Sequence, residues 1–383
     1  MNNPPEKISA ITKALSLFVA CGIIFGLILG KTSPAFGSSL AKFIPVGLFL
    51  MIFPQMVKVD LGKVKEAFRG GKQLLITPLY NYLCSPFLVF LLAYIFLPDE
   101  PYLRTGLILT GVAPCIAMVT LWSGISGGNL SLSATLSAMD SILQVFLTPL
   151  YIALLVWAVP YDQSIILKLI AMYLGMPLIV GNIVRYGILK YKGEEGLERL
   201  EPYLEKTWLI GLVFTLVVMF SSGGEHILAN PWHLARIAIP LIIFFFIQFI
   251  LIFKTCKNLN LSYEDSVSIA FNGTGMNFEL AIAIALSAFP ARVAVATVMC
   301  PLIEVPVMLM LVRYAKNRRY QFTKSKEVGE NHNRDLASFR RQVVAHALMS
   351  RAKQKTQTNE TGSFDAKLVD TEKLPEILIK KGK

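Results

Sequence analysis

The sequence predicts an all-α membrane protein with ten transmembrane helices, arranged as two inverted five-helix repeats with broken fourth and ninth helices. Three observations predict this fold. Of the 383 residues, 54% are hydrophobic and only 16% are charged, whereas about 25% are charged in a soluble domain. Apolar segments of about 20 residues, the length that spans a bilayer, recur along the chain. Two of these segments contain helix-breaking residues at related places.

The chain contains ten apolar segments that we predict to be spans. They cover residues 11–30, 42–57, 72–97, 103–125, 130–159, 164–189, 206–222, 233–253, 263–288 and 291–314. The loops that follow even-numbered spans carry 12 Lys and Arg, and those that follow odd-numbered spans carry 6. Because positively charged loops stay on the cytoplasmic side, both termini are predicted to be cytoplasmic.

The net charge of +12 is concentrated at one end of the chain. Residues 1–314 hold 21 Lys and Arg against 17 Asp and Glu, whereas residues 315–383 hold 16 against 8. We therefore divide the chain into a short cytoplasmic N-terminus (1–10), a ten-span body (11–314) and a basic cytoplasmic tail (315–383). Within the tail, residues 334–355 have the pattern of a basic amphipathic helix, and residues 356–375 are predicted to be disordered. A membrane surface explains this charge better than a nucleic-acid partner.

The ten spans divide into two halves, about 11–159 and 164–314. Because five is odd, the second half enters the membrane from the opposite side, which makes an inverted repeat. The segment "DSILQVFLTPL" (140–150) aligns with "CPLIEVPVMLM" (300–310). The same offset aligns "GVAPCIAMVTLW" (111–122) with "FNGTGMNFELAI" (271–282).

The last pair of segments interrupts the fourth and ninth helices. Pro114 removes a backbone donor and clashes with the preceding turn, and Gly273 and Gly275 are poor helix formers. Interrupted backbone at membrane depth is tolerated only where it is buried in protein or lines a cavity. Two breaks at equivalent places predict a substrate site near the midplane. A packing kink is the alternative reading of either break alone.

Three acids lie within the spans, where a charged group is costly and each is a functional hypothesis. Glu279 follows the second break and could carry a proton or help to bind sodium. Glu304 could likewise carry a proton or help to bind sodium. A structural role in a helix distorted by Pro301 and Pro306 is equally supported. Asp140 shares one helix face with two side chains that could supply cation oxygens, Ser137 and Gln144. A second proton or cation group and a structural partner are both open readings of Asp140.

The five cysteines form no metal or disulfide pattern. We therefore expect neither a metal site nor a cofactor, and no catalytic arrangement of an enzyme is visible. Four cysteines are read as small buried side chains. Cys115 directly follows Pro114 at the first break, where a soft sulfur ligand would suit a thiophilic substrate.

Four motifs carry a resemblance to a known family. They are "FPQMVKVDLGKV" (53–64), "APCIAMV" (113–119), "NFELAIAIAL" (277–286) and "PLIEVPVMLMLV" (301–312). They resemble the arsenite permeases of the yeast-type arsenical-resistance family, which belongs to the bile acid:sodium symporter superfamily. The resemblance covers about residues 11–314 and implies the ten-span inverted-repeat fold, with the two breaks crossed in its core.

The resemblance implies a secondary active transporter of the plasma membrane that exports arsenite, and in some members antimonite, by proton antiport. The family's essential cysteine falls on Cys115 and its essential glutamate on Glu279; Pro114 and Asn277 stand beside them as expected substrate contacts. There are departures, because Met276 replaces one of two usual Asn residues and Asp140 stands where Asn is expected.

Two other functions are open at this point. One is a sodium-coupled symporter of an organic anion, whose sodium oxygens would come from Ser137, Gln144, Asn277 and Glu279. The other is a membrane sensor or scaffold that acts through the tail. In every case we expect the bilayer as a partner, and the transport readings add a small solute and a proton or sodium ion.

Overall fold

A computed structural model describes residues 18, 21–59, 71, 73–116, 118–229 and 231–322. Regular structure in these residues is helical, and they contain no strand, only an isolated bridge between Pro114 and Met276. The described residues all belong to the first of two units along the chain, Met1–Ser325. The N-terminal segment 1–10 and the predicted tail helix 334–355 lie outside the described residues.

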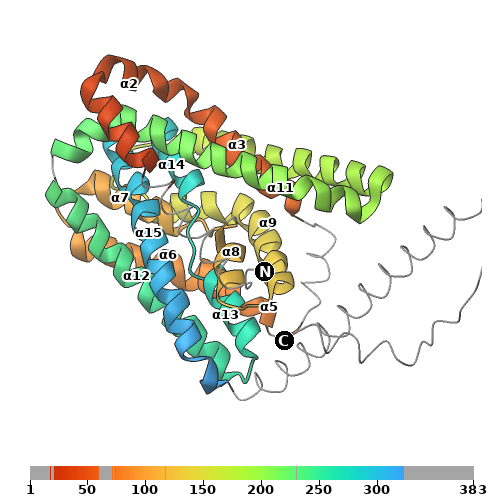
Figure 1. Cartoon of the computed structure of the whole chain (residues 1–383). Helices are drawn as coiled ribbons and strands as arrows, with labels where there is room; N and C mark the ends of the chain where they lie inside the picture. Colours follow the sequence, from red (N-terminus) through yellow and green to blue (C-terminus); the bar gives the residue numbers. More distant parts are fainter. Residues whose placement is uncertain are drawn as a thin grey trace, which may run out of the picture. The chain divides into compact units, whose positions relative to one another are not determined.

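The helices follow one another along the first unit, after a helical segment over Cys21–Thr32 (Figure 1). They are α2 (Pro34–Leu40), η1 (Ala41–Phe43), α3 (Ile44–Lys58), α5 (Gln73–Leu79), η2 (Tyr80–Cys84), α6 (Ser85–Phe96), α7 (Pro101–Gly111), α8 (Met118–Ile125), α9 (Leu130–Leu155), α10 (Gln163–Ile170), η3 (Ala171–Gly175), α11 (Met176–Ala229), α12 (Pro231–Asn258), α13 (Tyr263–Asn272), α14 (Phe278–Ala288), α15 (Ala291–Asn317) and η4 (Arg319–Gln321).

Among the residues that the structure describes, six helical segments are long and apolar enough to cross a membrane. They are Gln73–Phe96, Leu130–Leu155, Gln163–Leu197, Arg199–Ser222, Leu234–Asn258 and Arg292–Asn317. The bent pair α2 and α3 makes a seventh if it is one span. The predicted spans 103–125 and 263–288 are each interrupted, by the gaps between α7 and α8 and between α13 and α14. The membrane character is thus confirmed, whereas the count of ten spans stays a prediction.

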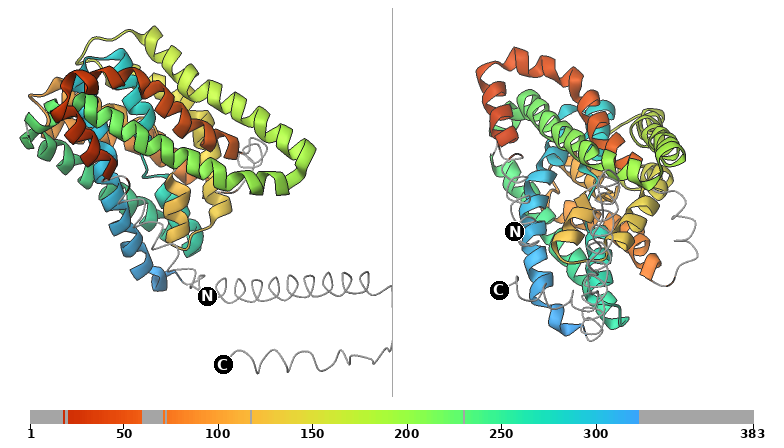
Figure 2. Two further views of the ribbon diagram at one scale, coloured as in Figure 1. Left: turned by 45° about the horizontal axis from the view of Figure 1, so that its top comes forward. Right: turned by 45° about the vertical axis from the view of Figure 1, so that its right-hand side comes forward.

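Helices α2, α3 and α11 lie side by side and form one group within the first unit (Figures 1 and 2). Helix α11 consists of two helices joined at Gly193, whose φ of +63° favours glycine. Small residues bring α3 and α11 close together. A Cβ atom at Gly181 would lie 2.7 Å from the Met56 backbone, and one at Gly211 would lie 2.9 Å from the Leu50 backbone.

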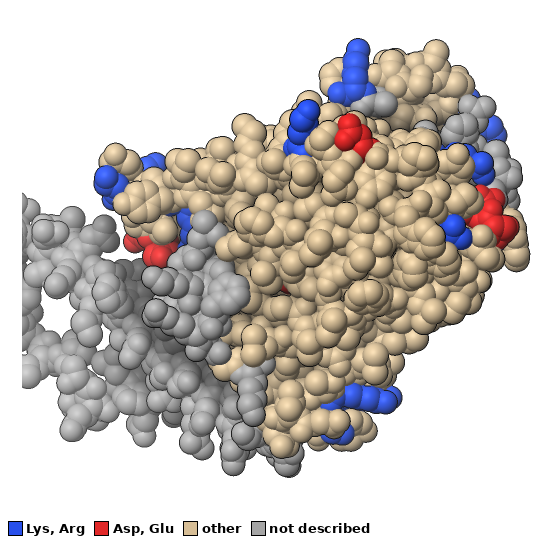
Figure 3. All heavy atoms as spheres, turned by 180° about the vertical axis from the view of Figure 1, so that it is seen from behind, with Lys and Arg blue, Asp and Glu red and all other residues tan. Residues whose placement is uncertain are grey.

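The surface of the first unit is mostly uncharged. Figure 3 shows charged side chains at the margins of one face and a broad uncharged area between them. On α9, Phe146, Leu150 and Leu154 follow one another at helical spacing with exposed fractions of 70%, 59% and 58%. An apolar face this exposed is typical of a helix that contacts lipid.

The helix of the predicted tenth span continues beyond residue 314 to Asn317, and η4 follows it. Phe322 then turns back onto the body and is only 4% exposed. Its ring lies 4.9 Å from that of Phe253 and 5.7 Å from that of Tyr263, measured between centroids. The start of the predicted tail is therefore anchored to α12 and α13.

We predict that Phe322→Ala destabilises the protein, because it removes a buried ring from this aromatic cluster. The expected loss is about 3 kcal/mol in the free energy of unfolding, measured by thermal unfolding in detergent. The control is Tyr320→Ala, since Tyr320 is 81% exposed and should change the stability by less than about 0.5 kcal/mol. Equal stabilities of the two variants would contradict the anchoring role.

Candidate functional site

The two predicted breaks meet each other in space. Between α7 and α8 the chain is extended at Pro114, and between α13 and α14 it is extended at Met276, and the two residues form an antiparallel bridge. The backbone N–H of Cys115 donates to Gly275 O at 2.9 Å, and the N–H of Asn277 donates to Ala113 O at 2.8 Å. The two breaks therefore meet in a direct backbone pairing, as the resemblance implies.

The residue types at the crossing explain why it forms there. In this bridge the hydrogen bonds come from the flanking residues, so the missing N–H of Pro114 leaves no donor unpaired. Gly275 allows the close approach of the two backbones. A Cβ atom at this position would lie 2.8 Å from the Cys115 Cβ and 2.6 Å from a methyl carbon of Val119. A Cβ atom at Gly273 would likewise lie 2.5 Å from the terminal methyl carbon of the Ile252 side chain.

Cys115 and Asn277 lie on the two opposite segments of this pairing, and both are buried. The Asn277 side chain accepts a hydrogen bond from Leu280 N at 3.0 Å and so caps α14. Its amide also donates to Gln144 Oε1 on α9 at 3.1 Å. The predicted substrate contacts are thus adjacent, and Gln144 ties them to the neighbouring helix.

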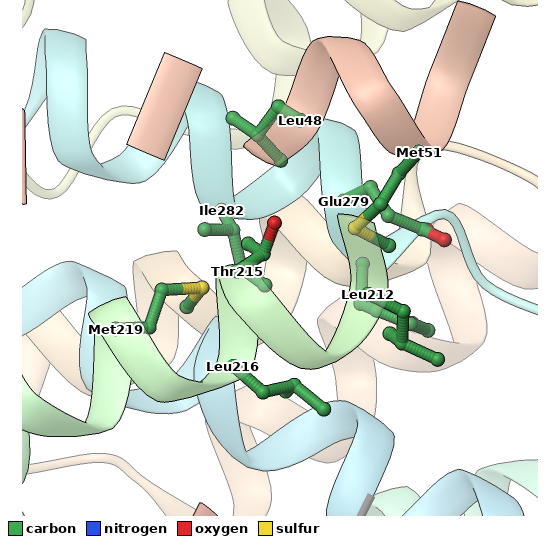
Figure 4. Close-up of a pocket in the computed structure, with 9 residues that line it drawn as sticks. Leu48, Met51, Leu212, Thr215, Leu216, Met219, Glu279 and Ile282 are labelled. Carbon is green, nitrogen blue, oxygen red and sulfur yellow. The ribbon is translucent and has the colours of Figure 1, made fainter. Parts of the chain in front are cut away.

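Glu279 lies in the first turn of α14, where a carboxylate interacts favourably with the helix dipole. It is 4% exposed. It lines a cavity between α14, α3 and α11, together with Leu48, Met51, Leu212, Thr215, Leu216, Met219, Phe278 and Ile282 (Figure 4). The interior offers about 10 Å³ to the centre of a water molecule, which is the room that one water needs.

Glu304 approaches the crossing from α15 and is fully buried. Its Oε2 atom lies 3.8 Å from the Sγ of Cys300, one helical turn earlier, and that sulfur lies 3.9 Å from the Sδ of Met276. The reading of Cys300 as a small buried side chain is confirmed, since it is 0% exposed, but the sequence analysis did not anticipate the acid beside it. The signal was present, because positions 300 and 304 have the spacing of neighbours on one helix face.

Asp140 belongs to a second polar group, which surrounds the end of α13. Its Oδ2 atom accepts a hydrogen bond from the Asn81 amide at 2.9 Å. The same amide lies 3.2 Å from the carbonyl oxygen of Asn272. The Ser137 hydroxyl donates to the Asn272 side chain at 2.9 Å. The predicted common face of Ser137, Asp140 and Gln144 is therefore turned towards α13 and α14, and Asn81 and Asn272 are members that sequence reasoning missed.

Several buried polar atoms near the two breaks have no hydrogen-bond partner among the described residues. They are Asp140 Oδ1, Gln144 Nε2, Gln248 Oε1 and Glu304 Oε1. Such atoms are uncommon in folded proteins, because desolvation without a partner costs free energy. They are candidates for contact with a proton, an ion or a substrate. No group of three His, Cys, Asp or Glu in the described part of the chain is arranged to hold a metal ion.

We predict that Gly275→Ala separates the two breaks, because its methyl group would collide with Cys115 and Val119. The expected cost is about 1–3 kcal/mol in the free energy of unfolding, measured by thermal unfolding in detergent. Gly187→Ala is the control, since a Cβ atom there would meet nothing within 4 Å. A Gly275→Ala variant as stable as the control would contradict the close crossing.

Comparison with known proteins places the chain among transporters. Residues 45–230 match the Sodium Bile acid symporter family. The arsenical-resistance protein Acr3 of Corynebacterium glutamicum is 34% identical over 80% of this chain and 89% of its own. The arsenical-resistance protein Acr3 of Alkaliphilus metalliredigens is 32% identical over 83% of this chain and 95% of its own length. An uncharacterized transporter of Synechocystis is 36% identical over 82% and 91%.

Each of these relatives matches at least 80% of this chain. They are transporters by family, which agrees with the absence of an enzyme motif in the sequence. The resemblance found in the motifs is thereby confirmed. The chain is an integral membrane transporter and belongs to the sodium bile acid symporter family, together with the arsenical-resistance proteins that it resembles.

Proposed function

We propose that this protein exports arsenite, and with it antimonite, from the cytoplasm in exchange for protons. The observation that carries the proposal is the crossing of the two breaks. It brings the buried residue Cys115 next to the start of α14, the helix that carries the buried Glu279 in its first turn. The similarity to two arsenical-resistance proteins over most of the chain supports the choice of substrate. We further propose that the body of the protein has ten spans in two inverted repeats. The two interrupted segments run antiparallel where they pair, as inverted repeats would place them.

Cys115 is the proposed soft contact of the substrate. Arsenite is mainly the neutral trihydroxide near pH 7, and its arsenic binds sulfur strongly. Cys115 is 1% exposed and lies where backbone of both breaks is extended rather than helical. A neutral oxyacid can enter such a site without the cost of burying a charge. Pro114 and Asn277 shape the site, and the Asn277 amide keeps Gln144 in place beside it.

Glu279 is the proposed proton carrier. It follows the crossing directly and faces the cavity between α14 and the pair α3 and α11 (Figure 4). Its neighbours there are apolar apart from Thr215. A carboxyl group in these surroundings is costly when charged, so proton binding and release would accompany a change in its access to water. Glu304 and Asp140 are the additional acids through which a proton or cation could act.

The orientation of the protein in the membrane follows from the charge of the loops. We propose a location in the plasma membrane with both termini in the cytoplasm, because basic residues are twice as frequent in the loops after even-numbered spans. Export then uses proton entry along the gradient and the membrane potential.

We predict that Cys115→Ser and Glu279→Gln each abolish arsenite uptake into everted membrane vesicles that carry a proton gradient. Cys115→Ser removes the thiophilic contact, and Glu279→Gln removes the titratable group while keeping its size. The control is Cys256→Ser, because Cys256 is an equally buried thiol on α12 away from the crossing. Unchanged uptake in both site variants would refute the assignment of the site.

A sodium-coupled symporter of an organic anion is the second candidate, because the family takes its name from such carriers. Ser137, Gln144, Asn277 and Glu279 are the oxygen-bearing residues that would serve it. In the structure the oxygen of Gln144 already accepts a hydrogen bond from Asn277, which favours a structural use of that pair.

The two candidates differ in their coupling ion. In sodium-free buffer we expect everted vesicles to accumulate arsenite when a proton gradient is imposed and to stop when an uncoupler collapses it. Adding sodium on either side should change the rate little. A strict sodium requirement, together with no protection of an arsenic-sensitive host, would replace the proposal with the sodium symporter.

A further inference from the structure

Cys300 lies at the crossing although no step of the proposed transport uses it. It belongs to α15 and is 0% exposed. Its sulfur contacts two groups of different chemistry, the Glu304 carboxyl oxygen at 3.8 Å and the Met276 sulfur at 3.9 Å. Met276 is itself the residue that pairs with Pro114. Cys300 is therefore in contact with the break and not only with α15.

Cys115 approaches the same stretch of chain from the other side. Its backbone N–H donates to the carbonyl oxygen of Gly275, the residue before Met276, at 2.9 Å. The side chain of Cys115 begins close to this residue, because a Cβ atom at Gly275 would lie 2.8 Å from the Cys115 Cβ. Cys115 and Cys300 thus contact two consecutive residues of the second break, Gly275 and Met276.

A second observation points to a ligand at this place. The Oε1 atom of Glu304 is buried and has no hydrogen-bond partner in the described part of the chain, whereas its Oε2 atom faces the Cys300 thiol. A carboxyl group that served only to satisfy the helix between Pro301 and Pro306 would have both oxygens occupied. The Glu304 carboxyl group instead keeps one oxygen atom, Oε1, without a partner among the described residues, while its other oxygen atom faces the Cys300 thiol.

We propose that Cys300 is a second sulfur ligand of the transported substrate, so that trivalent arsenic is held by the Cys115 and Cys300 thiols together. The inference rests on the proposed function. Two As–S bonds form and two As–O bonds break: the trihydroxide and two thiols yield a bis-thiolate arsenic hydroxide and two waters. Arsenic stays trivalent, so no oxidant or reductant is needed.

Glu304 has a defined part in this exchange. Its Oε2 atom accepts the proton of the Cys300 thiol, and the carboxylic acid then returns that proton to a departing hydroxide, which leaves as water. Release of the substrate reverses both transfers. Two sulfur ligands select for a substrate with at least two exchangeable hydroxides, which a single thiol does not.

Arsenicals with different numbers of exchangeable hydroxides test the inference. Phenylarsonous acid has two such groups and dimethylarsinous acid has one. In everted vesicles we expect phenylarsonous acid to compete with arsenite uptake and dimethylarsinous acid to compete poorly. Cys300→Ser should lose most of the uptake, and its remaining uptake should no longer discriminate between the two competitors. Cys256→Ser, the matched buried thiol, should keep both the rate and the discrimination.

The outcomes separate this inference from the proposed function. If Cys300→Ser keeps the rate and the discrimination while Cys115→Ser abolishes uptake, the second ligand is refuted and arsenite export stands. If neither variant affects uptake, the site assigned under the proposed function fails as well.

A measurement on the purified wild-type protein does not depend on the variants folding. Reaction with phenylarsonous acid should give one adduct, formed with the loss of two waters, and should protect both Cys115 and Cys300 from later alkylation in peptide mass spectra. An adduct that leaves Cys300 open to alkylation would overturn the inference.

Discussion

The antiparallel pairing of the two helix breaks is the interaction on which the rest of the structure depends. An interrupted helix at membrane depth exposes backbone donors and acceptors, and each costs several kcal/mol if it finds no partner. Here Cys115 and Asn277 donate to the carbonyls of Gly275 and Ala113. Each break satisfies the other, so four half-helices must end or begin at one place.

Side chains complete what the backbone pairing leaves open. Asn277 caps α14 and reaches Gln144, and Gln248 donates to the carbonyl of Gly273 at 3.0 Å. At the end of α13, Asn81 connects the carbonyl of Asn272 with the carboxyl of Asp140. The helix ends are thus held by amide groups, which need no charge of their own, and the buried acids keep oxygens that are not committed to structure.

The position of Glu279 follows from the packing of two groups of helices. Helices α3 and α11 approach closely through glycines and form a firm pair. The face that they present to α14 consists of larger side chains, such as Leu48, Met51 and Met219, and leaves the small cavity that Glu279 lines. A buried acid between tightly packed helices would be trapped, whereas one at this boundary has space for water next to it.

The sequence by itself determined the membrane character, the helical fold and both breaks, and it singled out Cys115 and Glu279 as candidate site residues. These features depend on composition, on residues that interrupt a helix and on the cost of a buried charge, all of which are local. Only the tertiary structure decided that Cys300 and Glu304 join Met276 at the crossing and that Asp140 pairs with Asn81. Periodicity shows which residues share a face of one helix, but it does not show which distant helix meets that face.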